Sequence, residues 1–264
     1  MHQIKPDIEA LSKSILAYAM ERLRMHPPSI DHPLPQTTLE ALAGQTITAE
    51  GLGGEQALTL FIETLAPACI SQDHPRYLSF VPTAPSEVST LFDLVVGTSN
   101  ICASSWLEGA GAIYAENQAL RWISDIAGFP AQAGGAFVSG GTAGNLSALV
   151  AARHDWRHQH PEHATKRGLI VSSRGAHASI EQAAHVMDAD LVESGSHQLT
   201  GSDVAKTIAA LNTEDRSRLF AVACTAGTTN LGVIDDMQGI GDVCSKERIW
   251  SVSYTHLRAH ETQF

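Results

Sequence analysis

The sequence is poor in several features that mark specialised classes of protein. Its 17 basic residues are outnumbered by 28 acidic ones, and the net charge of -11 repels polyanions, which argues against a general role in nucleic-acid binding. The four cysteines lie far apart without a C-x-x-C pair, so neither a disulfide framework nor a metal site is indicated. We expect them to be buried free thiols.

Long hydrophobic runs are also absent. No segment approaches the roughly 20 apolar residues that span a bilayer, and residues 1–13 lack the basic and apolar regions of a signal peptide. We therefore expect a cytoplasmic protein whose partner is a small molecule, not a membrane or a nucleic acid. Its 264 residues are enough for one large or two ordinary domains.

The most informative feature that is present is a glycine-rich stretch at residues 134–153. The helical spacing of Leu146 and Leu149 predicts a helix that starts near Thr142. Glycines around this start let the backbone approach a ligand closely, and the free N–H groups and dipole of a helix N-terminus favour a bound phosphate. The alternative is that Ser139 or Thr142 only caps a buried helix.

The region before this stretch has the apolar spacing of α-helices. We expect a helix over residues 8–18 that ends before Pro27, a linker at 26–38, a helix over 58–65, a helix capped by Ser86, and a helix from about Glu108 to Ala127. The opening part of the chain is thus predicted to be mostly helical.

Strands and helices alternate after the glycine-rich stretch. We expect strands at 168–172 and 219–225, a helix opened by a capping box of Ser179 and Gln182, a helix capped by Ser202, and a helix over 237–244. This order predicts an α/β fold with a mostly parallel sheet covered by helices on both faces. Ligands bind beyond the carboxyl ends of such strands, where residues 139–145, 174–179 and 226–230 fall.

Four segments of the sequence stand out in order: HPRYLSFVPT at 74–83, SGGTAGN at 139–145, AHAS at 176–179 and AGTTNLGVID at 226–235. Together they resemble the pyridoxal-phosphate-dependent amino-acid decarboxylases of the aromatic-amino-acid, histidine and glutamate decarboxylase group. The similarity covers about residues 40–250. The resemblance implies the large domain of a fold-type I pyridoxal-phosphate enzyme, with a helical region at 1–85 and a cofactor-binding domain at 86–250.

The resemblance also implies roles for five residues. Gly141 and Thr142 would bind the cofactor phosphate. His177 would stack on the pyridine ring and act in catalysis, Thr229 would approach the ring, and Thr83 would meet the substrate carboxylate or the phosphate. Without the resemblance, His177 is a polar residue of a strand-to-helix loop, and the two threonines are turn residues.

Two groups that the chemistry requires are missing from the expected places. None of the five lysines stands where the family has its Schiff-base lysine, and Tyr254 stands four residues after Trp250, where the family has the acid that pairs with the ring nitrogen. Residues 251–264 turn polar where a central parallel strand should be apolar, and they resemble adapter-derived sequence. We therefore expect the truncated N-terminal half of a decarboxylase with a foreign tail, inactive by itself.

Three functions remain open at this point. The first is a fragment of an L-amino-acid decarboxylase whose parent enzyme is a homodimer that releases carbon dioxide. The second is another fold-type I enzyme, such as an aminotransferase or a cysteine desulfurase. The third is a noncatalytic phosphate-binding or dimerisation module, which the missing lysine favours.

Overall fold

The structure is a computed structural model that describes residues 6–25, 28–29, 32–78, 85–195, 197–229 and 231–254. The chain forms two compact units, Met1–Leu94 and Val95–Phe264, which are described one at a time. Within the described ranges, no helix has both the length and the apolar character needed to cross a bilayer.

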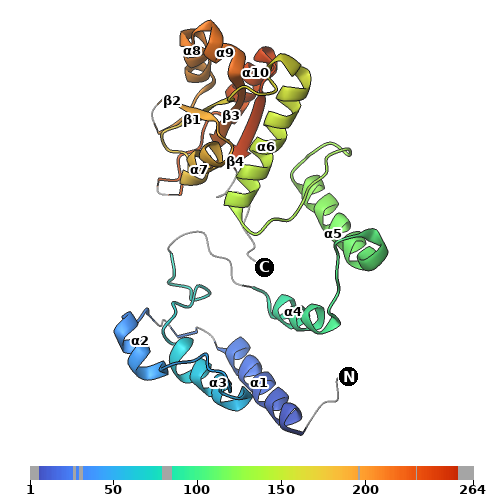
Figure 1. The fold of residues 1–264 in the computed structure, drawn as a ribbon, viewed down its shortest axis with the longest axis vertical. Coiled ribbons are helices and arrows are strands. Elements are labelled where there is room, and N and C mark those ends of the chain that lie inside the picture. Colours follow the sequence, from blue (N-terminus) through green and yellow to red (C-terminus); the bar gives the residue numbers. More distant parts are fainter. Residues whose placement is uncertain are drawn as a thin grey trace. The chain divides into compact units, whose positions relative to one another are not determined.

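The first unit is helical, as the sequence predicts (Figure 1). It contains α1 (Pro6–Arg24), α2 (Gln36–Ala43), α3 (Gly54–Leu60), the π-helical turn η1 (Phe61–Leu65) and the start of α4 (Glu87–Ser99). The ring of Tyr18 meets that of Phe61 edge-on at 6.0 Å, which joins α1 to η1. The short helix α2 was not predicted, and it begins inside the expected linker.

The second unit begins with the end of α4 and contains α5 (Trp106–Ile126), α6 (Gly141–Gln159) and a short 3-10 turn, η2 (Pro161–His163). The prediction of a helix start near Thr142 is confirmed to within one residue. Gly128 follows α5 with a φ of 72°, a conformation that favours glycine and that ends the helix where predicted.

A four-stranded parallel sheet forms the centre of the second unit (Figure 1). Its strands are β1 (Leu169–Ser173), β2 (Asp190–Ser194), β3 (Leu219–Thr225) and β4 (Trp250–Tyr254), in the spatial order β2-β1-β3-β4. The strands alternate with α7 (Ala178–Val186), α8 (Gly201–Ala210), α9 (Thr213–Arg218) and α10 (Met237–Glu247). Parallel pairing follows from these helical crossovers.

Helices cover both faces of the sheet, which confirms the predicted architecture. On one face, α6 and α7 pack Leu149 and Ile180 against Phe220. On the other face, α8 and α10 pack Val204 and Ile240 against the remaining strand side chains. Burial of each such side chain contributes about 1.5–3 kcal/mol, so the two apolar layers hold the sheet in place.

Two predicted helix caps are wrong. The N-cap of α7 is His177, whose Nδ1 accepts from the backbone N–H of Ser179. The N-cap of α8 is Thr200, which forms a capping box with Asp203, so Ser202 lies inside the helix. A cap residue needs an extended backbone before the first turn, and the loops that leave β1 and β2 reach this conformation two residues earlier than expected.

The first residues of the predicted foreign tail, as far as Tyr254, form a strand of the sheet despite their polar sequence. Residues 250–254 pair in parallel register with β3, and Val252 and Tyr254 are buried while the two serines between and before them are exposed. β4 is the edge strand of the described sheet, its apolar contacts come from Val252 and Tyr254, and its two serines are exposed, so serine is tolerated there. Residues 255–264 lie outside the described part of the chain.

The cysteines differ in their environments. Cys224 and Cys244 are buried free thiols, as expected, but Cys69 and Cys102 are exposed in connecting segments. Burial raises the pKa of the Cys244 thiol to about 11, so this thiol is protonated and unreactive at neutral pH.

Candidate functional site

A cavity of about 390 Å³ lies beyond the carboxyl ends of β1, β2 and β3. It is lined by residues 174–178, which follow β1, by His197, which follows β2, and by Thr228, Thr229 and Leu231, which follow β3. This is the edge at which parallel α/β sheets bind ligands. Two of the predicted site residues, His177 and Thr229, therefore line one cavity.

The ring of His177 is held by a chain of hydrogen bonds from α6. Asn145 Nδ2 donates to Ser179 Oγ at 2.8 Å, and that hydroxyl lies 2.9 Å from His177 Nδ1. The backbone N–H of Ser179 also donates to Nδ1, at 3.2 Å. Nδ1 is therefore an acceptor, and the proton of the neutral imidazole resides on Nε2.

This hydrogen-bonded chain is shielded from water. The exposed fractions are 4% for Asn145 and 0% for Ser179, whereas His177 itself is half-buried. The His177 ring lies 5.8 Å from the ring of Tyr254, between centroids, at an interplanar angle of 55°. The phenol of Tyr254, at the position where the resemblance implies an acid, thus lies beside His177.

A tight turn after β3 presents Thr229 to the cavity. The backbone N–H of Thr228 donates to Val233 O at 2.9 Å, and the N–H of Val233 donates to Thr228 Oγ1 at 3.1 Å. The N–H of Gly232, at a φ of 64°, donates to Thr228 O. The turn is therefore stabilised by the buried Thr228, while Thr229 is exposed at the rim of the cavity.

Sequence reasoning missed two residues that bring the three loops together. The buried carboxylate of Asp235 accepts from the backbone N–H groups of Leu199 and Thr225, both at 2.7 Å, which ties the loop after β2 to the end of β3. Burial raises the pKa of Asp235, and these two donors oppose that effect. At Gly175, a Cβ would lie 2.8 Å from His197 O, so only glycine fits there.

The start of α6 offers unused donors. Gly140, at a φ of 147°, is the N-cap, and no side chain caps the helix. The first backbone N–H groups of a helix have no intrahelical partner, so those at Gly141 and Thr142 face outward from an uncapped N-terminus. These two residues do not line the 390 Å³ cavity. Asn145, one turn further along α6, connects the helix to His177.

Two further groups belong to the expected site, a Schiff-base lysine and Thr83. None of the four lysines that the structure describes, Lys13, Lys166, Lys206 and Lys246, is among the cavity's lining residues. Thr83, predicted to contact substrate, lies outside the described residues.

Known proteins resemble this chain in sequence and in fold. The family profile described as "Pyridoxal-dependent decarboxylase conserved domain" matches residues 42–252. An aromatic-L-amino-acid decarboxylase of Bacillus atrophaeus is 32% identical over 184 residues, which cover 67% of this chain and 37% of the relative. The chain thus spans less than half the length of this curated relative.

Solved structures share the fold. The 4-hydroxyphenylacetaldehyde synthase of Rhodiola rosea superposes with a TM-score of 0.83 at 18% identity, over 95% of this chain and 57% of that one. The TDC of Oryza sativa, solved with PLP and tryptamine, superposes with a TM-score of 0.82 at 15% identity, over 95% of this chain and 56% of that one. With a profile match over most of its length, the chain belongs to the pyridoxal-dependent decarboxylase family.

Proposed function

We propose that this chain is the cofactor-binding part of an L-amino-acid decarboxylase, and that the whole protein releases carbon dioxide from an amino acid. The observation that carries the proposal is the convergence of His177 and Thr229 on one cavity at the carboxyl edge of the sheet. Membership of the family favours decarboxylation over the aminotransferase and desulfurase alternatives.

The residues present suit pyridoxal phosphate in two respects. The uncapped N-terminus of α6 supplies N–H groups for a phosphate at Gly141 and Thr142. The half-buried imidazole of His177 offers a flat surface for the pyridine ring, and Thr229 offers a hydroxyl from the opposite loop. The chemistry that the cofactor supplies when bound is acceptance of the electron pair left by the departing carboxylate.

The chain's own residues would orient the reacting groups. Ser179 and Asn145 fix the plane of the His177 ring and keep its proton on Nε2. With Nδ1 engaged as an acceptor, any hydrogen bond that the neutral ring donates comes from Nε2–H. Thr83 would contact the substrate carboxylate, as the resemblance implies. A cytoplasmic location and a homodimeric whole protein also remain predictions.

We further propose that this chain binds the cofactor without turning over substrate. No lysine lines the cavity among the residues that the structure describes, and Tyr254 cannot replace an acid as the partner of a ring nitrogen. Borohydride reduction with pyridoxal phosphate, followed by peptide mapping, should give scattered and substoichiometric lysine labelling. Stoichiometric labelling of one lysine, with carbon dioxide release, would contradict this.

Binding is tested with pyridoxamine 5′-phosphate, which has no aldehyde and so reports noncovalent contacts alone. We expect His177→Ala to weaken binding by about two- to tenfold, because a stacked aromatic contact contributes about 0.5–1.5 kcal/mol. His185→Ala is the matched control, since His185 is an exposed histidine near the other end of α7. Equal affinities of the two variants would overturn the assignment of the cavity.

A further inference from the structure

A histidine-rich segment lies at the opposite edge of the sheet from the cofactor cavity. Residues 154–163 span the end of α6 and η2 and contain four of the 13 histidines of the chain. Two of them, His160 and His163, line a separate cavity of about 460 Å³ near the amino ends of β3 and β4, together with Leu219 and Ile249. The proposed decarboxylase function uses none of these residues.

Three ligand-type side chains of this segment converge on one point. His160 Nδ1 lies 3.4 Å from Glu162 Oε1, and His163 Nε2 lies 3.5 Å from the same oxygen. All three donor atoms lie within 4.8 Å of one another. Donor atoms around a tetrahedral zinc, with bonds of about 2.0–2.2 Å, are separated by about 3.3–3.5 Å, which matches the two shorter distances.

The local structure holds these side chains in place without a metal. His163 is 8% exposed, and its ring stacks on Trp156, with centroids 5.4 Å apart and planes 9° from parallel. The backbone N–H of His163 donates to His160 O at 2.8 Å, which closes the turn that carries all three residues. His163 is thus a rigid ligand, and His160 and Glu162 are exposed partners that need only small adjustments.

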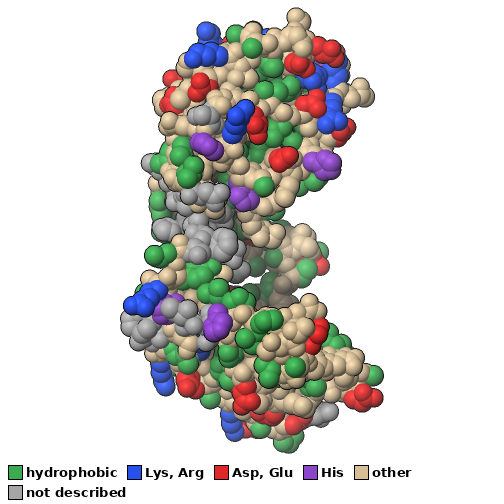
Figure 2. Space-filling view, turned by 90° about the vertical axis from the view of Figure 1, so that its left-hand side faces the viewer, with side chains coloured by type: hydrophobic (Ala, Val, Ile, Leu, Met, Phe, Trp, Pro, Cys, Tyr) green, Lys and Arg blue, Asp and Glu red, His purple; other side chains and the backbone are tan. Residues whose placement is uncertain are grey.

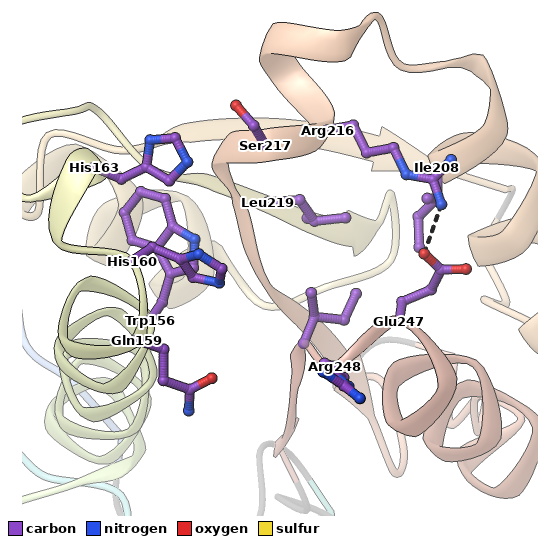
Figure 3. A pocket seen from close by; sticks show the side chains of 11 residues that line it. Trp156, Gln159, His160, His163, Ile208, Arg216, Ser217, Leu219, Glu247 and Arg248 are labelled. Atoms are coloured by element: carbon purple, nitrogen blue, oxygen red, sulfur yellow. Dashed lines mark hydrogen bonds and ion pairs between the residues drawn. The ribbon is translucent and has the colours of Figure 1, made fainter.

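The cavity leaves room for a fourth ligand. Figure 3 shows His160 and His163 on the same side of the cavity as Trp156, while Arg216 and Glu247, joined by an ion pair of 2.7 Å, lie across from them. The side of the cluster that faces the cavity is therefore open to water. Two imidazoles, one carboxylate and an open position form a ligand set that suits zinc and related transition metals better than Mg²⁺ or Ca²⁺.

We propose that His160, Glu162 and His163 bind one divalent transition-metal cation of the Zn²⁺ class. His163 Nδ1 is buried and has no hydrogen-bond partner among the described residues. Loss of such an outer partner typically weakens metal binding about 10–100-fold, so the site binds more weakly than a closed structural zinc site. Binding would tie η2 to the end of α6, independently of the cofactor cavity.

The experiment titrates the purified chain with Zn²⁺ against a chromophoric chelator and records the visible spectrum with Co²⁺. We expect one equivalent of Zn²⁺ and an intense Co²⁺ absorption typical of a tetrahedral site. His160→Ala and Glu162→Gln should each weaken Zn²⁺ binding by roughly tenfold or more and abolish the Co²⁺ band. Both residues are exposed, so these variants should fold, whereas replacement of the buried His163 risks unfolding.

His154→Ala is the matched control, because His154 is an exposed histidine of the same segment outside the three-residue cluster. It should keep both the stoichiometry and the Co²⁺ band. The proposal is overturned if the wild-type chain binds no Zn²⁺, if Glu162→Gln binds as tightly as wild type, or if His154→Ala loses binding to the same extent as His160→Ala.

Discussion

The side chain of Ser179 connects helix α6 to the ring of His177. Its hydroxyl accepts from Asn145 and lies within hydrogen-bonding distance of His177 Nδ1, and it is fully buried. At this scale, the hydroxyl of one serine orients the proposed stacking residue, and the backbone N–H of the same serine makes Nδ1 an acceptor. The prediction that Ser179 caps α7 was wrong, because the neighbouring histidine caps the helix instead.

We predict that Ser179→Ala lowers the free energy of unfolding by about 1–3 kcal/mol, because it leaves the buried amide of Asn145 without its acceptor. Urea unfolding followed by circular dichroism measures the change. Ser147→Ala is the control, since Ser147 is an exposed serine of α6, and its effect should stay within about 0.5 kcal/mol. Equal midpoints for the two variants would refute the connecting role of Ser179.

At the scale of elements, the site depends on three loops that meet at one edge of the sheet. Gly175 allows the loop after β1 to approach the loop after β2, where a Cβ would lie 2.8 Å from a carbonyl oxygen and 3.2 Å from Thr228 Cγ2. The nearer contact is with backbone, and the other is with the branched side chain of the buried Thr228, so neither neighbour moves aside easily.

We predict that Gly175→Ala destabilises the chain by about 1–3 kcal/mol through overpacking and weakens pyridoxamine 5′-phosphate binding. Gly241→Ala is the control, because Gly241 lies within α10 and an added methyl group there would have no atom within 4 Å, so alanine should stabilise the helix by about 0.5–1 kcal/mol. Thermal unfolding of both variants tests the opposite signs. Stabilisation by both substitutions would contradict the close approach of the loops.

An ion-pair network joins three further elements at the other edge. Asp190, at the start of β2, pairs with Arg218 at the end of α9 and with Arg167 just before β1. A hydrogen bond from Arg218 is the main reason that the pKa of Asp190 is lowered, and the charge of Arg167 adds to it. The network therefore stabilises the fold only while Asp190 is ionised.

The sign of the pH dependence follows from this lowered pKa. The stabilisation is fully present above the unfolded-state pKa of about 3.9 and is lost as the pH falls through the lower folded-state value. We predict that Asp190→Asn lowers the unfolding free energy at pH 7 by no more than about 1 kcal/mol, since the pair is partly exposed, and that the difference from wild type shrinks as the pH falls below about 4. A difference that grows on acidification would contradict the network.

At the scale of the whole molecule, many large apolar side chains are exposed. They include Val88, Phe92 and Val96 of α4 and Leu107, Trp122 and Ile126 of α5. Figure 2 shows apolar side chains at the surface of the face in view, among the charged ones. Monomeric proteins rarely expose this much apolar surface on neighbouring positions of a helix.

We predict that the chain self-associates in solution, as the proposed homodimeric whole protein requires. Sedimentation velocity should show a concentration-dependent increase in mass, and Phe92→Glu should reduce it, because a charge replaces an apolar side chain that is 60% exposed. Glu87→Gln, at the start of the same helix, serves as the control. A clean monomer at high concentration would refute the prediction.

Local sequence patterns were enough for most of the fold. The apolar run at 219–225 predicted the bounds of β3, the alternation of strands and helices predicted a parallel sheet covered on both faces, and the glycine-rich start of α6 was located to within one residue. These features depend on burial and on backbone freedom, which are properties of neighbouring residues.

Other features depend on partners that are distant in sequence, so they could be read only from the folded chain. Neighbouring loops and strands decide four such features: His177 caps α7, Ser251 fits in β4, Cys102 is exposed and Asp235 is buried. The order of residues was sufficient for the fold class and for the positions of His177 and Thr229 after strands. Their meeting in one cavity required parallel strands to end at a common edge, because contacts between loops depend on strand order and register.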